Sequence, residues 1–374
     1  MPATTLNVDQ AVRNRYGAAA QEAEAALCCP VDYDAAHLKV LPAEILERDY
    51  GCGDPSKWVE AGETVLDLGS GGGKICYIAS QVVGPRGRVL GVDCNDEMLN
   101  LARRHQADVA ADIGHDNVTF FKGRIQDLAL DLDRFGDTLA SHPAADAAGW
   151  LNALEAADRQ RRESPMIADE SVDVVVSNCV LNLVAEADRR QLFAEVRRVL
   201  KPGGRAVISD IVSDRPVPQH LKDDADLWSG CISGSYEESA FLDAFEEAGF
   251  YGIEVVARQA EPWQVVEGIA FRSVTVRAYR AAAEADSPHE GHHAVYNGPW
   301  AFAMDEAGLQ LSRGEAVPVT AAQSRRLGRP PYADCVTLLK TADGDESVVD
   351  AAPASPSRPS LEVIGGCCGT EGCC

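Results

Sequence analysis

Short apolar runs alternate with amphipathic segments from residue 61 to about residue 210 of the chain. The runs are rich in Val, Ile, Leu and Phe, which is typical of strands buried on both faces. The segment 98–105 between two of them has the apolar spacing of a helix. Strands that alternate with helices predict an α/β fold, a doubly wound, mostly parallel and Rossmann-like sheet. The predicted strands are 64–68, 88–93, 118–122, 172–177 and 205–210.

The remaining patterns divide the chain into further units. Residues 1–60 predict a helical segment with cysteines, and residues 61–285 the α/β domain. An Ala-, Asp- and Arg-rich stretch at about 129–170 predicts a helical insertion into that domain. Residues 286–345 predict a small C-terminal unit, and the Asp-, Ala-, Ser- and Pro-rich residues 346–374 predict a flexible, Cys-rich tail.

The composition makes the chain strongly acidic. Of the 374 residues, 46% are hydrophobic, which allows a sizeable core, and the formal net charge is −24. Such a charge repels a phosphate backbone, so we expect no nucleic-acid partner. No apolar run is long enough to span a bilayer, and residues 1–17 lack the apolar core of a signal peptide. We therefore expect a cytoplasmic, monomeric protein without a membrane partner.

A glycine-rich turn follows the first predicted strand. Its sequence, VLDLGSGGG, covers residues 65–73 and joins a strand to a helix. Glycines let a ligand approach the backbone closely, and the helix N-terminus attracts an anionic group. Dinucleotide-binding folds have a similar turn, so this motif alone does not distinguish the two classes of protein.

Asp93 ends the second predicted strand. An acidic side chain at this distance from the glycine turn can accept hydrogen bonds from both hydroxyls of a ribose. The alternative is that Asp93 caps the following helix, a role for which Asn95 competes. We favour the ribose interpretation because the spacing suits it.

Two further segments distinguish the classes. Residues 122–127 follow the third strand, where an adenine would lie, and Leu-Lys-Pro-Gly-Gly at 200–204 predicts a tight turn before the fifth strand. Together with the glycine turn and Asp93, they resemble the class I S-adenosylmethionine methyltransferases. The resemblance implies S-adenosyl-L-methionine as cofactor. The residues assigned to it are Asp67, Gly69, Ser70, Gly71, Gly73, Asp93, Cys94, Met98, Ile125, Gln126 and Asn178.

The chain has 12 cysteines, and in a reducing compartment these are expected to be thiols. Turn residues accompany the Cys28–Cys29 doublet, Cys52, Cys179 and Cys231. Cys179 ends the fourth predicted strand, at the sheet edge where open α/β folds bind ligands. Soft thiolates suit As(III), and three of them can fill its three bonds and leave its lone pair exposed.

These cysteine motifs resemble those of the arsenite methyltransferase family. Tyr-Gly-Cys-Gly at 50–53, Ser-Asn-Cys-Val at 177–180 and Cys-Ile-Ser-Gly at 231–234 are specific as a set. The resemblance covers residues 28 to about 280 well and 286–345 loosely.

The resemblance also implies roles for single cysteines. Cys179 and Cys231 would bind arsenic, with Cys52 as the third ligand of the metalloid site. Cys52, Cys28 and Cys29 would form a thiol–disulfide relay that keeps arsenic trivalent between methylations.

The chain departs from the family pattern in two places. Lys74-Ile75 stands where the family has an Arg-Asp pair, which weakens any transfer of residue roles at the methionine end of the cofactor. Gln126 stands where the family has Glu, and its amide can still donate and accept hydrogen bonds.

The other cysteines and a histidine cluster receive simpler interpretations. The thiols of Cys76, Cys94 and Cys335 are expected to be small apolar groups without a chemical role. A flexible tail has no packing reason for cysteines, so its two pairs are predicted to capture arsenic or a metal. These pairs are Cys367, Cys368, Cys373 and Cys374. His289, His292 and His293 are interpreted as part of a solvated linker.

The sequence therefore predicts a methyltransferase that acts on thiolate-bound trivalent arsenic, in arsenite detoxification. Its substrates would be arsenite or methylated arsenicals as thiol conjugates, with a reductant such as glutathione or thioredoxin. We expect thiolates activated by nearby positive charge or helix ends. Two alternatives stay open: a class I methyltransferase for a small organic carbon or oxygen nucleophile, and a metalloid-binding protein without catalysis.

Overall fold

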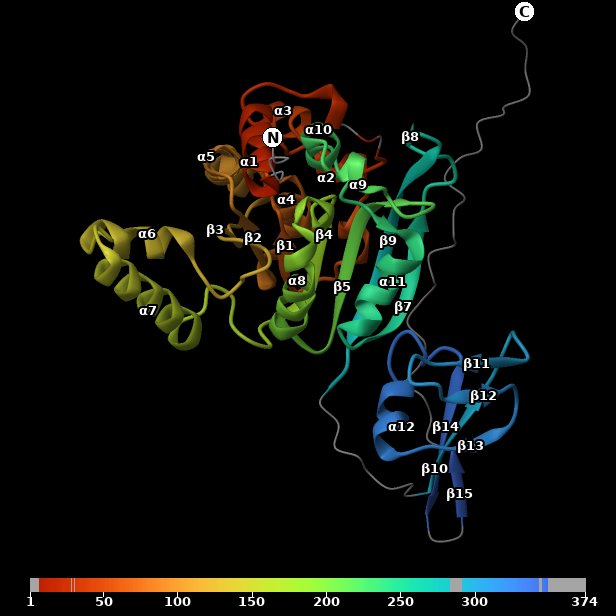
Figure 1. Cartoon of the computed structure of the whole chain (residues 1–374). Coiled ribbons are helices and arrows are strands. Elements are labelled where there is room, and N and C mark those ends of the chain that lie inside the picture. Colours follow the sequence, from red (N-terminus) through yellow and green to blue (C-terminus); the bar gives the residue numbers. More distant parts are fainter. Residues whose placement is uncertain (1–6, 28, 30, 283–290, 343–344, 349–374) are drawn as a thin grey trace, which may run out of the picture.

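The computed structural model describes residues 7–27, 29, 31–282, 291–342 and 345–348 (Figure 1). Its centre is a nine-stranded sheet. The strands are β1 (Thr64–Leu68), β2 (Arg88–Asp93), β3 (Val118–Lys122), β4 (Val172–Asn178), β5 (Leu200–Ser213), β6 (Tyr236–Glu237), β7 (Phe250–Arg258), β8 (Gln264–Val266) and β9 (Ile269–Arg280). Parallel strands follow the order β3-β2-β1-β4-β5, and β9 and β7 continue the sheet with antiparallel pairing. The predicted mostly parallel α/β fold is confirmed.

Helices cover both faces of the sheet. The main ones are α1 (Val8–Ala19), α4 (Lys74–Val83), α5 (Asp96–Ile113), α8 (Glu186–Val199) and α11 (Glu238–Glu247). Alternate strand residues face opposite sides, so Leu66 and Leu68 of β1 belong to the apolar cluster of α8 and α11, whereas Val65 belongs to that of α4 and α5. The sheet is thus buried on both faces, as its continuous apolar strands require.

Shorter elements connect these layers. They are the helices α2 (Ala35–Leu38), α3 (Ala43–Glu47), α9 (Gln219–Lys222) and α10 (Ala225–Ser229), and the 3-10 turns η1 (Ala25–Leu27), η2 (Pro55–Trp58), η3 (Gly84–Arg86) and η4 (Leu181–Leu183). The predicted helical insertion consists of α6 (Leu132–Ser141) and α7 (Ala147–Glu163), a hairpin that projects beside the sheet (Figure 1). In the described part of the chain, no helix has both the length and the apolar character needed to cross a membrane.

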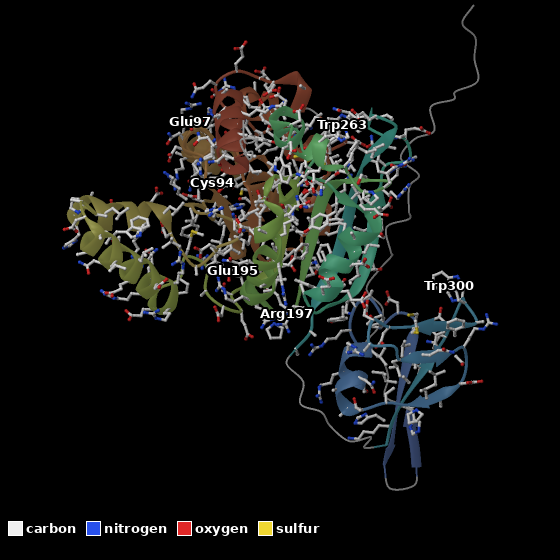
Figure 2. All side chains as sticks on the ribbon, viewed as in Figure 1. Cys94, Glu97, Glu195, Arg197, Trp263 and Trp300 are labelled. Carbon is white, nitrogen blue, oxygen red and sulfur yellow. The ribbon has the colours of Figure 1, made fainter. Side chains whose placement is uncertain are left out.

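A small unit follows the main sheet. It contains β10 (His292–Tyr296), β11 (Phe302–Met304), β12 (Gln310–Ser312), β13 (Ala316–Pro318), α12 (Ala321–Leu327), β14 (Val336–Ala342) and β15 (Asp345–Val348). It has its own apolar core, while Trp300 is 72% exposed at its surface (Figure 2). The Glu306 carboxylate joins the unit to β7, because it accepts hydrogen bonds from the backbone N–H groups of Gly252 (2.7 Å) and Ile253 (3.2 Å).

Two local predictions were wrong. Residues 200–204, predicted as a turn before the fifth strand, belong to β5 itself, where a bulge opposite β4 absorbs Gly203 with its positive φ of 81°. His292 and His293, predicted as part of a linker, begin strand β10, which pairs with β14. In both places, pairing with a neighbouring strand extends a strand into residues whose local sequence favours a loop. His289 lies outside the described residues.

Phe245 of α11 should be central to the stability of the core. Its ring is fully buried and lies 5.0 Å, 5.4 Å and 5.8 Å from those of Phe193, Phe241 and Phe250, centroid to centroid. We expect Phe245→Ala to lower the free energy of unfolding by about 3–5 kcal/mol, because it leaves a cavity among these rings. Val265→Ala, at a 63% exposed position, is the control and should change it by less than about 0.5 kcal/mol. Urea unfolding checks this, and similar losses in both variants would contradict it.

Candidate active site

A pocket opens at the carboxyl ends of β1, β2 and β4. Nearly all of the residues predicted to bind the cofactor line it. They are Asp67, Gly69, Ser70, Gly71, Asp93, Cys94, Met98, Ile125, Gln126 and Asn178. Residues from widely separated motifs therefore meet at one edge of the sheet, where open α/β folds bind their ligands.

Gly73 is the exception, because it does not belong to the pocket wall. Its φ of 89° is left-handed, and a Cβ at this position would lie 2.9 Å from the Phe120 ring and 3.0 Å from the Tyr77 ring. The structure therefore places Gly73 where α4 packs closely against its neighbours.

The Asp93 carboxylate organises the floor of the pocket. It accepts hydrogen bonds from the N–H groups of Gly71 (2.9 Å) and Asn95 (2.8 Å), and burial raises its pKa. Asn95, rather than Asp93, caps α5, since its side chain accepts from the N–H groups of Glu97 and Met98. The capping alternative for Asp93 is therefore wrong.

One polar atom in the pocket wall lacks a partner. The hydroxyl of Ser70 is buried and makes no hydrogen bond within the described residues. A buried hydroxyl without a partner is costly, so this atom indicates a polar ligand group beside the glycine turn.

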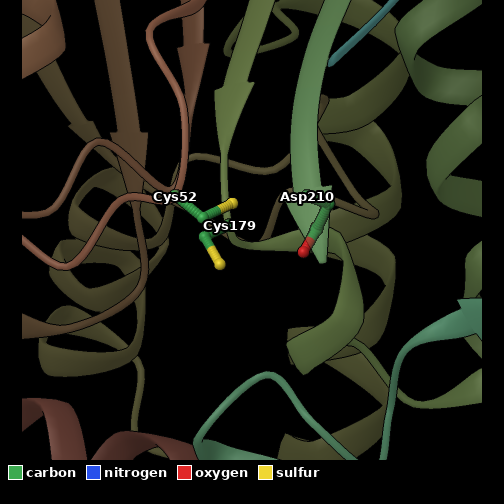
Figure 3. Close-up of side chains that lie close together, drawn as sticks. All are labelled: Cys52, Cys179 and Asp210. Carbon is green, nitrogen blue, oxygen red and sulfur yellow. The ribbon is translucent and has the colours of Figure 1, made fainter. Parts of the chain in front are cut away.

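Three cysteine side chains meet next to this pocket. The sulfur atoms of Cys52 and Cys179 lie within 4.8 Å of each other and of a carboxylate oxygen of Asp210 (Figure 3). The Cys231 thiol donates a hydrogen bond to the Cys179 carbonyl (3.2 Å) and contacts the Cys179 thiol. All three cysteines are buried, and Cys179 also lines the pocket. The thiols predicted to bind arsenic are thus brought together from three distant segments.

The other predicted cysteines are placed as follows. Cys29 is half-buried and packs against the same apolar cluster as Cys52, Cys179 and Cys231. None of the seven cysteines that the structure describes forms a disulfide bond. Cys28 and the tail residues Cys367, Cys368, Cys373 and Cys374 lie outside the described residues.

The backbone is strained at two of the thiols. Cys179 and Cys231 have φ angles of 64° and 60°, in the left-handed region that side chains with a Cβ rarely adopt. Each such residue costs roughly 1–3 kcal/mol, and such strain concentrates at functional sites. The left-handed turns aim both thiols toward each other, which points to a function for the cluster.

The turn that carries Cys52 is held by Asn178 at the end of β4. The Asn178 amide oxygen accepts hydrogen bonds from the N–H groups of Cys52 (2.9 Å) and Gly53 (3.0 Å). A Cβ on Gly51 would lie 2.0 Å from the Asn178 amide nitrogen, so only glycine fits there. Asn178 was predicted to bind the cofactor. Although it lines the pocket, its amide is engaged by the Cys52 turn.

Asp210 was not predicted. Its carboxylate accepts hydrogen bonds from the N–H groups of Leu181 (2.9 Å) and Ile211 (2.8 Å) and from the Asn182 side chain (2.7 Å). Burial raises its pKa to about 6. It shapes the turn after Cys179. An acidic residue late in a buried strand, on the same sheet edge as Cys179, was the available signal.

The expectation of thiolates activated by positive charge was wrong for two of the cysteines. Burial, with the nearby Asp210 carboxylate, raises the pKa of the Cys52 thiol. Hydrogen bonds with the Cys231 and Cys52 thiols, together with burial, raise the pKa of Cys179 well above its usual value. Both side chains are therefore neutral thiols at neutral pH. The cluster suits an uncharged ligand better than a metal cation.

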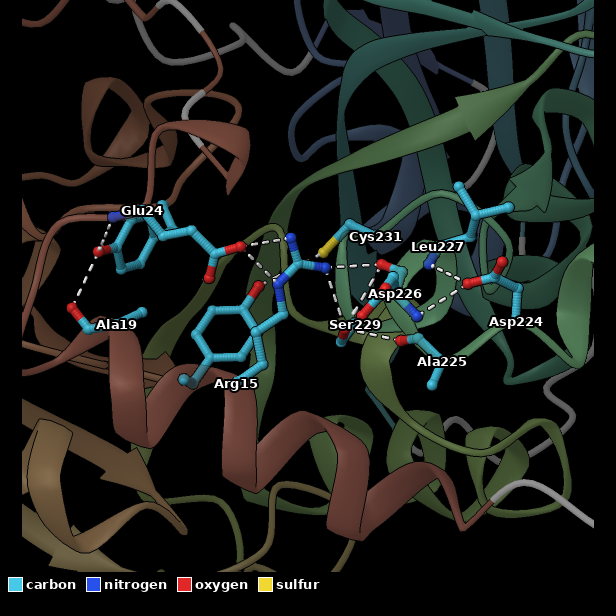
Figure 4. A network of polar contacts seen from close by, with 11 residues as sticks. Arg15, Ala19, Glu24, Asp224, Ala225, Asp226, Leu227, Ser229 and Cys231 are labelled. Carbon is cyan, nitrogen blue, oxygen red and sulfur yellow. Dashed lines mark hydrogen bonds and ion pairs between the residues drawn. The ribbon is translucent and has the colours of Figure 1, made fainter.

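Helix α1 closes the site from outside, which the sequence did not indicate. Asp9, Arg13 and Tyr16 line the pocket, and the Tyr16 hydroxyl lies 3.9 Å from the Cys231 sulfur. Arg15 ties α1 to α10, because it donates to the Asp226 carbonyl (2.6 Å) and the Ser229 hydroxyl (3.0 Å) (Figure 4). One helix thus contacts both the pocket and the Cys231 loop.

Comparison with known proteins identifies the fold family. Residues 59–162 and 151–249 match a family described as a methyltransferase domain. The chain belongs to this family. Residues 284–360 match a second family, a domain of unknown function.

Several proteins similar in sequence to this chain are arsenite methyltransferases. That of Halobacterium salinarum is 33% identical over 274 residues, 73% of this chain and 59% of the relative. That of Aquipseudomonas alcaligenes is 34% identical over 67% of this chain and 64% of its own length. The chain spans less than two thirds of these two relatives. The human arsenite methyltransferase is 27% identical over 88% of this chain and 86% of its own length.

A solved structure of a similar enzyme also aligns with this chain. An arsenic (III) S-adenosylmethionine methyltransferase from Chlamydomonas reinhardtii aligns with a TM-score of 0.56 and 25% identity, covering 86% of this chain and all of that one. The resemblance to arsenite methyltransferases that the cysteine motifs indicated is confirmed.

Proposed function

We propose that this chain is an enzyme that transfers methyl groups from S-adenosyl-L-methionine to trivalent arsenic held by its cysteines. One observation carries the proposal. The thiols of Cys52 and Cys231 lie beside Cys179, and Cys179 lines the pocket that also contains the glycine turn and Asp93. A nucleotide-like ligand and a soft electrophile would therefore meet at Cys179.

The pocket residues fit the cofactor. Asp93 can receive the ribose hydroxyls, the buried residues Ile125 and Gln126 can flank the adenine, and the Ser70 hydroxyl gains a partner. When bound, S-adenosyl-L-methionine supplies an electrophilic methyl group. The protein orients the reactants, and α1 shields them from water.

Neutral thiols suit arsenous acid, which is uncharged at neutral pH. Each As–OH group can condense with one thiol, forming an As–S bond and releasing one water molecule. No net proton is exchanged, so the raised pKa values of Cys52 and Cys179 do not oppose binding. The bound arsenic keeps a lone pair that carries no proton. Methyl transfer to it therefore needs no general base.

A relay of thiols completes the proposed cycle. Transfer of a methyl cation leaves arsenic formally pentavalent. Attack of the Cys29 thiol on the arsenic-bound sulfur of Cys52 would form an S–S bond and break the As–S bond. The electron pair of the As–S bond stays on arsenic, which becomes trivalent again, and the Cys29 proton goes to solvent. Cys29 packs against the apolar cluster that contains Cys52 and Cys231, which supports a role as partner of Cys52.

The cellular setting belongs to the same proposal. A reductant such as glutathione or thioredoxin would reopen the disulfide, and arsenite or methylated arsenicals would arrive as thiol conjugates. We assign the activity to the cytoplasm, because thiols persist in a reducing compartment. The proposal also includes a role in arsenic detoxification and a monomeric protein.

The decisive assay combines the purified chain, labelled S-adenosyl-L-methionine, a thiol reductant and arsenite. We expect methylated arsenicals by chromatography, and the loss of almost all product in Cys179→Ser and Cys231→Ser. Cys52→Ser should slow arsenite methylation more than methylation of a methylated arsenical. Cys335→Ser, in the C-terminal unit, is the matched control and should behave like the unchanged chain. A Cys179→Ser variant that keeps its methyltransferase activity would instead favour an organic nucleophile as the substrate. If the unchanged chain binds arsenite but forms no methylated product, it is a metalloid-binding protein without catalysis.

Proton exchange tests the neutral state of the thiols. We expect arsenite to bind at pH 7.5 with nearly the same calorimetric enthalpy in phosphate and in Tris, because condensation at Cys52 and Cys179 moves no net proton. If these residues were thiolates, each would release hydroxide and draw one proton from the buffer. A difference between buffers that corresponds to two or more protons would contradict the assignment.

A further inference from the structure

A buried charge pair forms part of the pocket wall. The Lys74 ammonium lies 2.8 Å from a carboxylate oxygen of Asp49 and 3.6 Å from the centre of the Tyr33 ring. The two charged side chains are only 10% and 17% exposed, and both residues line the pocket. Burying an ion pair costs free energy that its own attraction often fails to offset, so this pair calls for a further role.

The pair lies where the pocket has no other assigned group. Asp93 and the segment with Ile125 and Gln126 account for a nucleoside. Lys74 directly follows the glycine turn, and Asp49 precedes the Cys52 turn. The wall formed by Lys74 and Asp49 is therefore the part left for the amino-acid end of S-adenosyl-L-methionine.

Other cations in the pocket are engaged or lie elsewhere. Arg124 pairs with Asp9 (2.8 Å), and Arg48 pairs with Glu44 (2.5 Å). Arg13 lies beside Cys94, and its carbonyl accepts a hydrogen bond from Asn95, at the ribose end. Among the described residues, Lys74 is thus the cation best placed for a carboxylate near the glycine turn.

The charges of the pair match this end of the cofactor. A methionine moiety carries one carboxylate and one ammonium. The positive charge of Lys74 is complementary to the carboxylate, and the negative charge of Asp49 to the ammonium. An ammonium has three donors, and the contacts to Asp49 and to the Tyr33 ring leave one for a ligand. The mutual pairing of Lys74 and Asp49 keeps both charges compensated before the ligand arrives.

Tyr33 fixes the pair relative to the thiols. Its hydroxyl lies 3.3 Å from the Asp49 carboxylate and 3.2 Å from the Gly53 carbonyl, and accepts a hydrogen bond from Asn178 (3.1 Å). Asn178 in turn holds the Cys52 turn. The charge pair and the arsenic-binding turn therefore share one rigid network.

We propose that Lys74 and Asp49 clamp the zwitterionic amino-acid end of S-adenosyl-L-methionine, Lys74 binding its carboxylate and Asp49 its ammonium. The clamp rests on the proposed function, because it presumes this cofactor. It makes both residues positioning groups that set where the methyl group stands relative to Cys179. It also gives the site a preference for intact S-adenosyl ligands over nucleosides.

Calorimetry on the full chain tests the clamp with two ligands. S-adenosylhomocysteine has the amino-acid end, and 5′-methylthioadenosine lacks it. We expect Lys74→Met to weaken binding of the first by about tenfold to a hundredfold, the effect of losing one or more charge-assisted hydrogen bonds. Binding of the second should change less than about twofold, since no lost contact involves it. Lys74→Arg should restore much of the affinity, because it keeps the charge.

Two further variants complete the test. Lys74→Met combined with Asp49→Asn removes both charges, so it leaves no unpaired buried carboxylate and guards against misfolding of the single variant. It should also lose S-adenosylhomocysteine selectively. Asp93→Ala should weaken both ligands, because both carry the ribose. Equal weakening of both ligands in the Lys74 variants, or no weakening, overturns the clamp alone. Failure of the unchanged chain to bind S-adenosylhomocysteine overturns the proposed function, and the clamp with it.

Discussion

The hydrogen bonds between Asn178 and the Cys52 turn join segments 125 residues apart in sequence, and the thiol cluster that we propose to bind arsenic depends on them. Asn178 ends β4, so the central sheet fixes its position. Its amide replaces the missing backbone partners of an irregular turn, which would otherwise be costly to bury. Gly51 is required for this close approach. The sulfur of Cys52 can therefore reach that of Cys179, the next residue after Asn178, only because the sheet is formed.

Burial controls the chemistry of the thiols. A desolvated sulfur favours its neutral form, and the nearby carboxylate of Asp210 reinforces this preference. A cation such as Zn²⁺ would need deprotonated ligands, whereas arsenous acid supplies the hydroxyl groups that leave with the thiol protons. The same burial holds Cys179 and Cys231 in left-handed conformations that a flexible loop would relax. The environment of the thiols thus favours the uncharged ligand that we propose for them.

The elements outside the sheet differ in their relation to the site. Helix α1 contacts the pocket through Tyr16 and the Cys231 loop through Arg15, so it can order both parts at once. The C-terminal unit instead attaches to β7 through Glu306, and none of its described residues lines the pocket. Among the described residues, those of the pocket and of the thiol cluster thus belong to the methyltransferase domain and its N-terminal segment.

The sequence by itself determined the sheet and the identity of the thiols. Apolar strands, the glycine turn and the cysteine–turn motifs are local patterns, and the parallel order brings their ends to one edge. Motif spacing also led to Asp93, whose alternative role as a helix cap the structure assigns to Asn95. Lys74 was noticed only as a departure from the family pattern, and its partner Asp49 carried no signal. Long-range contacts decided the rest: the Lys74–Asp49 pair, the role of Asn178, the nearness of Asp210 and the neutral state of the thiols. These properties depend on burial and on distances between remote segments, which only the folded chain defines.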